Sequence, residues 1–172
     1  GILNRGKNLE ILMRALRILD NAEILLIVAG DGPSRASLEE MARKWKLGNR
    51  VFFLGWLSQR ELWSLFSASD LYVHPSEGEG MPNAMLEALG SGLPCIGSKV
   101  PGVIDILGDG ELLFEPSDEE ALAEKIAHIF SASDSYVAVK NQCEERAKRF
   151  VFDWKDKVSQ IATQGFSLAG VT

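Results

Sequence analysis

Hydrophobic residues follow two patterns that alternate along the chain. Short continuous apolar runs are typical of buried strands, whereas apolar residues at every third or fourth position are typical of amphipathic helices. The runs at 23–30 and 51–55 are expected to be fully buried strands, of the kind that parallel sheets contain. Further strands are predicted at 70–75, 94–98 and 111–114, and helices at 9–19, 33–45, 58–68, 82–89, 118–130, 134–150 and 154–164.

Two of the helix starts carry a specific local signal. Ser58 with Glu61, and Ser117 with Glu120, have the spacing of a capping box, in which the two residues bond each other's backbone amides. The alternation of strands and helices predicts an α/β fold, with a Rossmann-like parallel sheet and helices on both of its faces. Ligands of such sheets bind beyond the carboxyl ends of the strands.

The chain is expected to form a single domain over residues 1–172, because neither an internal repeat nor a low-complexity linker interrupts it. This length is sufficient for a well-buried core. Residues 1–3 look like the tail of a strand, so we expect the chain to be a piece of a longer protein.

Composition argues against several classes of function. A net charge of −6 disfavours a broad electrostatic contact with nucleic acid. Two cysteines and two histidines have no zinc-ligand spacing. The sequence shows neither a signal peptide nor an apolar run of the roughly 20 residues that cross a bilayer. We therefore expect a cytoplasmic protein without a bound metal.

An unusual stretch at 75–88 follows the strand predicted at 70–75 and enters a helix. Pro82 suits the first helical position, because that position needs no amide hydrogen. The free amides of Asn83 and Ala84 would then lie at the positive end of the helix dipole. Such a helix start is suited to bind a phosphate.

Two carboxylates bracket this turn, Glu79 in the loop and Glu87 one turn into the helix. A carboxylate only accepts hydrogen bonds, and its two oxygens match a vicinal pair of sugar hydroxyls. Gly78 and Gly80 are expected to take unusual torsions and to let the backbone approach a ligand. The alternative interpretation is a pair of solvated glutamates around a glycine-rich turn.

The surrounding motifs favour the functional interpretation. The chain closely resembles the group-1 (family 4-like) retaining glycosyltransferases of GT-B fold, and corresponds to their C-terminal, nucleotide-sugar-binding domain. The family signature is a glutamate, seven residues and a second glutamate, with a Gly-Phe-Pro-like turn between and a small-Gly-Leu-Pro segment after. The matching segments are 30–33, 53–55, 76–88, 90–97, 100–103 and 113–122.

The resemblance implies roles for individual residues. Glu87 matches the glutamate that holds the ribose hydroxyls of the donor nucleotide, and Glu79 the one that lies against the donor sugar. Lys7 matches the lysine that neutralises the diphosphate, and an ammonium suits a leaving group on which negative charge accumulates. We therefore expect Glu79 and Lys7 to be catalytic. The turn whose backbone meets the sugar and the diphosphate is matched by Gly80, Met81, Pro82 and Asn83.

One position departs from the family pattern. Ile2 stands where the family usually has an arginine, and Arg5 is near enough to replace it, although a solvated side chain is an equal alternative. Gly32 is placed by the resemblance in a loop that borders the nucleotide; its segment lacks the third glycine of a dinucleotide fingerprint. His74 is expected to be packed or hydrogen-bonded rather than catalytic.

The resemblance implies a hexosyltransferase that moves a sugar from a UDP- or GDP-linked donor to a glycan or lipid-linked acceptor, with retention of configuration and without a cofactor. It also implies that acceptor groups come from a missing N-terminal domain, so that this domain is inactive alone. A helix within 151–172 would cross to that domain, and the membrane would be approached peripherally, at its inner face. Two alternatives are a non-catalytic nucleotide-binding module, which Ile2 favours, and a GT-B nucleotide-sugar epimerase.

Overall fold

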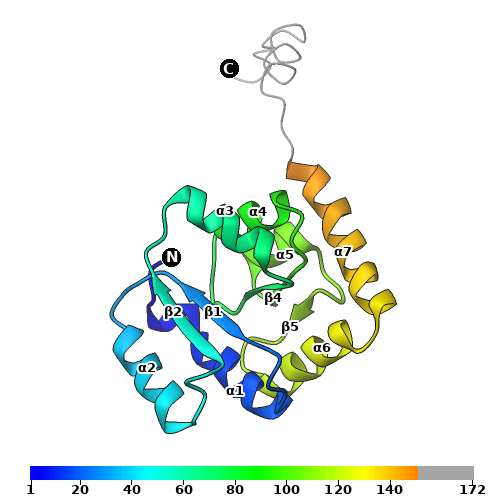
Figure 1. Ribbon diagram of the computed structural model, residues 1–172. Coiled ribbons are helices and arrows are strands. Elements are labelled where there is room, and N and C mark those ends of the chain that lie inside the picture. Colours follow the sequence, from blue (N-terminus) through cyan, green and yellow to red (C-terminus); the bar gives the residue numbers. More distant parts are fainter. Residues whose placement is uncertain (151–172) are drawn as a thin grey trace, which may run out of the picture.

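The computed structural model describes residues 1–150, so the helix predicted at 154–164 and the crossing helix within 151–172 lie outside the described residues. Strands and helices alternate along the chain as predicted (Figure 1). The strands are β1 (Leu26–Ala29), β2 (Val51–Gly55), β3 (Tyr72–His74), β4 (Cys95–Ser98) and β5 (Leu113–Phe114). The α-helices are α1 (Leu9–Leu19), α2 (Arg35–Lys44), α3 (Gln59–Ala68), α4 (Asn83–Gly90), α5 (Pro101–Leu107), α6 (Glu119–Ser131) and α7 (Ser133–Ala147), and the 3-10 helices are η1 (Arg5–Lys7) and η2 (Lys148–Phe150).

All strand pairs within the described sheets are parallel, which confirms the predicted α/β fold class. The strands form two sheets rather than one, with the orders β1-β2 and β3-β4-β5. Residues at the start of the chain lie beside the end of β1, where Ile2 forms a parallel bridge with Asp31. Helices lie on both sides of the sheets (Figure 1). The carboxyl ends of the parallel strands therefore carry the loops in which a ligand is expected.

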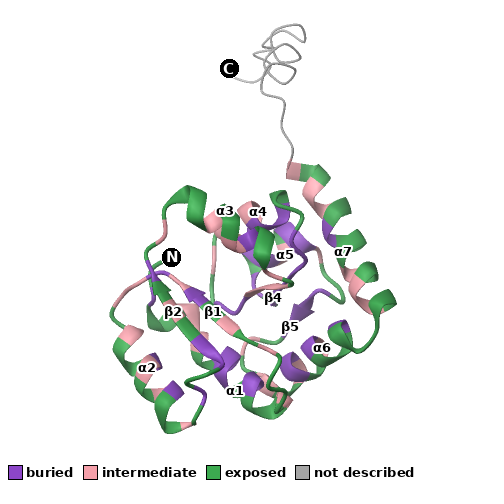
Figure 2. Ribbon diagram, viewed as in Figure 1, coloured by how far each residue is buried: buried purple, intermediate pink, exposed green. Residues whose placement is uncertain are grey.

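The buried side chains form two clusters. Figure 2 marks the buried residues along the ribbon in purple. The larger cluster joins the sheet β3-β4-β5 to α4, α5, α6 and one face of α1. The smaller cluster joins β1 and β2 to α2 and the other side of α1. Because α1 contributes to both clusters, it fixes the segment before it, η1, relative to the loops that follow β3.

The prediction that β1 and β2 are fully buried is wrong. Successive residues of a strand point to opposite faces of the sheet. Val28 is buried and Val51 packs into the smaller cluster, whereas Ile27 (36%), Phe52 (41%) and Leu54 (46%) are exposed on the opposite face. A continuous apolar run in the sequence does not show which faces of the strand are covered. Within residues 1–150, other elements cover only one face of β1 and β2.

One of the two predicted capping boxes is confirmed. The Ser58 side chain accepts a hydrogen bond from the Glu61 amide, and the Glu61 carboxylate accepts one from the Ser58 amide. The second prediction, Ser117 with Glu120, is wrong by one residue. Asp118 is the N-cap of α6, and its side chain accepts a hydrogen bond from the amide three residues further on. A carboxylate also suits the positive end of the helix dipole.

Candidate functional site

The candidate site lies where β3 ends and α4 begins. His74 ends the strand, and α4 starts at Asn83. Pro82 is the N-cap of α4 and not its first helical residue, which corrects the predicted position by one. Within residues 1–150 the amides of Asn83 and Ala84 have no hydrogen-bond acceptor. These amides therefore remain available for an anion at the positive end of α4.

Lys7 approaches this loop from the other end of the chain. It ends the short helix η1, whose N-cap Asn4 accepts a hydrogen bond from the Lys7 amide. Asn8 follows in the left-handed conformation and starts α1. The Lys7 ammonium forms an ion pair with the Glu79 carboxylate, although the two residues are 72 positions apart. The structure thus brings together the two side chains that were predicted to be catalytic.

The Glu79 carboxylate is held by three donors. Its Oε1 accepts hydrogen bonds from the Lys7 ammonium, from Ser76 Oγ at 2.8 Å and from His74 Nε2 at 3.2 Å. Burial alone would raise the pKa of Glu79, but the Lys7 and Ser76 hydrogen bonds and the nearby positive charge lower it below its usual value. Glu79 is therefore an ionised carboxylate at neutral pH.

His74 and Tyr72 continue this hydrogen-bonded group into the interior. The phenol oxygen of Tyr72 lies 3.1 Å from His74 Nδ1. Burial lowers the pKa of His74, and the Lys7 charge adds to this effect, while Glu79 acts in the opposite direction. Burial also raises the pKa of Tyr72, with smaller contributions from the thiol of Cys95 and from the two signature carboxylates. Both groups are accordingly neutral at neutral pH.

Glu87 lies one turn along α4 and is half-buried. Its carboxylate has no hydrogen bond to another part of residues 1–150. Its charge and that of Glu79 both act on the Tyr72 phenol, so the two carboxylates lie within electrostatic range of one group. Its charge and that of Lys7 both act on the Gly1 amine, whose pKa is lowered chiefly by burial. Glu87 therefore lies in the same part of the molecule as Glu79 and Lys7, although none of its atoms contacts theirs within residues 1–150.

Other predicted donor-binding residues are not joined to this group. Arg5 is exposed and lies with Glu77 and Ser34 around a cavity of about 230 Å³ that neither Glu79 nor Glu87 lines. Met81 is exposed and sits in the loop before α4. Gly32 packs against the chain start, because a Cβ there would lie 2.5 Å from the Leu3 carbonyl oxygen. This packing accounts for Gly32 without a ligand.

The prediction of unusual torsions at Gly78 and Gly80 is wrong. Neither residue has a positive φ, and a Cβ on either would meet no atom within 4 Å. A close approach between two parts of the backbone occurs at Gly102, a residue that was noted in the sequence only as part of the family segment 100–103. A Cβ there would lie 1.9 Å from the Gly80 carbonyl oxygen, and the Gly102 amide donates to the Glu79 carbonyl at 3.2 Å. The available signal in the sequence was the Pro-Gly pair at 101–102 within a family motif, because proline is favoured at the first position of a helix.

Replacing Gly102 by alanine should destabilise the protein, because the added methyl group collides with the backbone of the loop that carries Glu79. We expect the free energy of unfolding to fall by about 1–3 kcal/mol, as for other overpacked sites. Urea denaturation measures this change. Gly110→Ala is the control, because a Cβ at Gly110 meets nothing within 4 Å. Equal stability of the two variants would contradict the close approach.

Stability should decrease on mild acidification because of His74. A histidine whose pKa is lower in the folded state stabilises the fold fully above its ordinary pKa of 6.5 and loses that contribution as the pH falls toward the folded value. The loss is at most about 1.4 kcal/mol per pH unit for one group. Urea denaturation between pH 7.5 and 5.5 should show a shallower pH dependence in His74→Gln than in the exposed-site control His128→Gln. Parallel curves for both variants would argue against the assignment.

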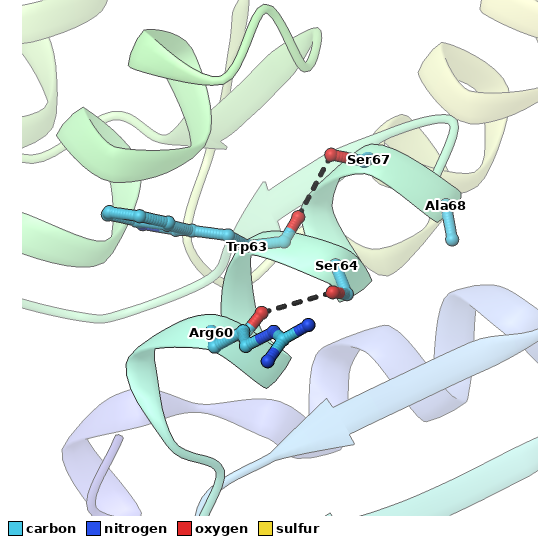
Figure 3. Close-up of a pocket in the computed structure, with 5 residues that line it drawn as sticks. All are labelled: Arg60, Trp63, Ser64, Ser67 and Ala68. Carbon is cyan, nitrogen blue, oxygen red and sulfur yellow. Dashed lines mark hydrogen bonds between the residues drawn. The ribbon is translucent and has the colours of Figure 1, made fainter.

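Neither Glu79 nor Glu87 lines either of two cavities on residues 1–150. The larger one, of about 460 Å³, is a shallow hollow along the outer side of α3 (Figure 3). It is lined by Arg60, Trp63, Ser64, Ser67 and Ala68, which follow one another at helical spacing. The hydroxyls of Ser64 and Ser67 are bonded to carbonyls of their own helix. This hollow therefore offers little polar chemistry, and the group around Glu79 is the better candidate.

Two negative findings concern the described residues. Over residues 1–150, no group of three or more His, Cys, Asp or Glu side chains is arranged to hold a metal ion. In the same part of the chain, none of the helices has the length and apolar character that crossing a membrane requires.

Comparison with known proteins decides the family. The family model described as "Glycosyl transferases group 1" matches residues 1–150. The chain belongs to this glycosyltransferase family. Solved glycosyltransferase structures have the same fold. HepE of Anabaena, solved with UDP and glucose, superposes on this chain with a TM-score of 0.81. The two are 25% identical in sequence, and the superposition covers 98% of this chain and 47% of HepE. Sucrose-phosphate synthase of Thermosynechococcus elongatus gives a TM-score of 0.78 at 28% identity, over 94% and 43% of the two chains.

Curated members of the glycosyltransferase family include much longer proteins. Sulfoquinovosyl transferase SQD2 of Arabidopsis thaliana is 29% identical over 98% of this chain and 32% of its own length. N-acetyl-alpha-D-glucosaminyl L-malate synthase of Bacillus anthracis is 27% identical over 84% of this chain and 37% of its own length. The chain thus spans about one third of the length of these relatives. The GT-B glycosyltransferase fold predicted from the sequence is confirmed.

Proposed function

We propose that this chain is the donor-binding domain of a retaining glycosyltransferase and binds a nucleoside diphosphate sugar. The observation that carries the proposal is the contact of Lys7 with Glu79 beside the open amides of α4. A cation, a helix start and an ionised carboxylate in one place are suited to a ligand that joins a diphosphate to a sugar.

Each group of the site has a matching part of the donor. The amides of Asn83 and Ala84 and the Lys7 ammonium bind the diphosphate, because it carries the negative charge. Glu87 accepts hydrogen bonds from the ribose hydroxyls, and Glu79 from a hydroxyl of the transferred sugar. The carboxylates thus flank the diphosphate and contact only neutral groups, which avoids charge repulsion.

During transfer, the bond between the anomeric carbon and the diphosphate oxygen breaks, and its electron pair leaves negative charge on the departing diphosphate. The anomeric carbon bonds the acceptor oxygen instead, and the proton of that acceptor hydroxyl passes to the departing diphosphate. Once the donor is bound and Lys7 has turned from Glu79 to the diphosphate, Lys7 and the start of α4 are in place before this charge develops, so they stabilise the transition state more than the bound donor. No proton transfer by these groups is required for the departure. Configuration at the anomeric carbon is retained in the proposed reaction.

The relatives support a proposed class of donor. HepE is solved with UDP and glucose, and a relative from Corynebacterium glutamicum, 37% identical over 89 residues, is a GDP-mannose-dependent alpha-mannosyltransferase. We therefore propose a UDP- or GDP-linked hexose as donor. A glycan or lipid-linked acceptor would be bound with the help of a further domain, at the inner face of a membrane that the protein approaches peripherally.

Thermal unfolding of the chain with a panel of ligands tests the proposal. UDP, GDP and their glucose, N-acetylglucosamine and mannose derivatives should include at least one ligand that raises Tm in a concentration-dependent manner, because binding to the folded state stabilises it. ADP-ribose serves as a comparison, since it has a diphosphate but no hexose. If none of these nucleotides raises Tm at millimolar concentration, the proposed function is wrong. Assay of the longer protein with labelled donors then separates transfer from epimerisation and from binding alone.

A further inference from the structure

The three donors that hold the Glu79 carboxylate all contact one of its oxygens. Oε1 accepts from Lys7, Ser76 and His74, and within residues 1–150 Oε2 accepts no hydrogen bond. These three hydrogen bonds hold the carboxylate in a defined orientation. The Glu79 side chain is nevertheless 15% exposed, so it still reaches the surface. Such a carboxylate presents Oε2 to a ligand and keeps Oε1 for the protein.

The three donors differ in how firmly they are held. Ser76 is fully buried, and its carbonyl accepts a hydrogen bond from the buried Ser98 hydroxyl. His74 is buried at the end of β3. Lys7 has a side chain that is 34% exposed, at the end of a three-residue helix. Lys7 is therefore the partner that can leave, whereas Ser76 and His74 stay.

The hydrogen bonds of His74 determine which of its nitrogens carries the proton. A carboxylate only accepts hydrogen bonds, so Nε2, at 3.2 Å from Glu79 Oε1, is the protonated nitrogen. In the neutral ring Nδ1 is then an acceptor, and the Tyr72 hydroxyl, at 3.1 Å, donates to it. The donors point in one direction, from Tyr72 through His74 to Glu79.

We propose that His74, held in one tautomer by Tyr72, is a positioning residue that fixes the Glu79 carboxylate for the donor sugar. This inference rests on the proposed function. When Lys7 moves from Glu79 to the diphosphate, His74 and Ser76 keep Oε1 in place, and Oε2 accepts a hydroxyl of the sugar. His74 touches neither the sugar nor the diphosphate and acts only through Glu79.

The inference distinguishes two ligands. A nucleoside diphosphate does not need Glu79, whereas the sugar of a nucleotide sugar does. The decisive quantity is the ratio of two dissociation constants, that of UDP divided by that of UDP-glucose. The corresponding ratio for GDP and GDP-mannose is the second test. Titration calorimetry on this chain measures all four constants. In His74→Leu this ratio should fall by about three- to tenfold, while the constant for the diphosphate alone changes by less than about twofold. Tyr72→Phe should lower the ratio by about two- to threefold.

Conservative and control variants separate positioning from packing. His74→Gln keeps an N–H donor on a side chain of similar length. Its ratio of dissociation constants should therefore lie close to that of the wild type. His128→Leu and Tyr136→Phe change the other histidine and the other tyrosine, which lie on α6 and α7 away from Glu79, and should leave the ratio unchanged. A folded His74→Leu protein in which both constants rise by the same factor would overturn the positioning role.

Nitrogen-15 NMR of the imidazole rings tests the same inference without a ligand, and also serves if His74→Leu does not fold. The chain has only two histidines, so His128→Gln identifies the signals of His74. We expect the Nε2-protonated tautomer in the wild type and a mixture of tautomers in Tyr72→Phe. An Nδ1-protonated ring in the wild type would overturn the inference. A wild-type protein that binds no nucleotide at all would instead overturn the proposed function, whatever the tautomer.

Discussion

Replacing Lys7 by methionine should lower kcat for sugar transfer by about 10²–10³-fold, the range found when one preorganised charge-stabilising group is removed. Lys7 is the one cation in contact with the Glu79 group within residues 1–150. The negative charge of the departing diphosphate would then be stabilised by the amides of α4 alone. Initial-rate assays with a labelled donor, on the longer protein that includes an acceptor-binding domain, measure this effect.

Two further variants make the Lys7 experiment specific. Lys140→Met removes an exposed lysine from α7 and should leave kcat unchanged. Lys7→Arg keeps the positive charge but not the compact ammonium, and should retain part of the activity. If Lys7→Met is as active as Lys140→Met, Lys7 has no part in the departure of the diphosphate.

Replacing Glu87 by alanine should weaken binding of the nucleoside diphosphate by about 10- to 100-fold, which corresponds to about 1.5–3 kcal/mol for a hydrogen bond to a charged group. The carboxylate has no partner within residues 1–150, so the free energy of unfolding should hardly change. Titration calorimetry with UDP and GDP measures the affinity, and urea denaturation checks the fold.

Glu124→Ala is the control for Glu87, because it removes an exposed glutamate from the middle of α6. It should leave both affinity and stability unchanged. Equal nucleotide affinity of the Glu87→Ala and Glu124→Ala proteins would show that Glu87 does not contact the ribose.

The regular elements were largely predictable, since their signals are local. Apolar spacing predicts α1 over the residues that form it, and the Ser58 capping box correctly marks the start of α3. The helix α5 was not predicted, because its seven residues are too few for a clear apolar period and include Gly102. The division into two sheets was also not predicted, because it depends on contacts that no single segment encodes.

The candidate site was predictable only in part. Glu79, Glu87 and Lys7 match family motifs, but their mutual placement depends on α1 packing against both core clusters. The hydrogen-bonded group of Tyr72, His74 and Glu79 has a weaker signal. Residues two apart in a strand share one face, so assigning the strand places Tyr72 and His74 on the same face, a consequence that was not drawn from the sequence. That the loop returns Glu79 to this face follows only from the folded chain.

The open space around Gly78 and Gly80 has a practical consequence for redesign. Because a Cβ at either position meets nothing within 4 Å, the loop accepts side chains there without displacing its own backbone. Gly102, behind the loop, tolerates none. A library that seeks altered sugar selectivity should therefore vary positions 78 and 80 and keep position 102 as glycine.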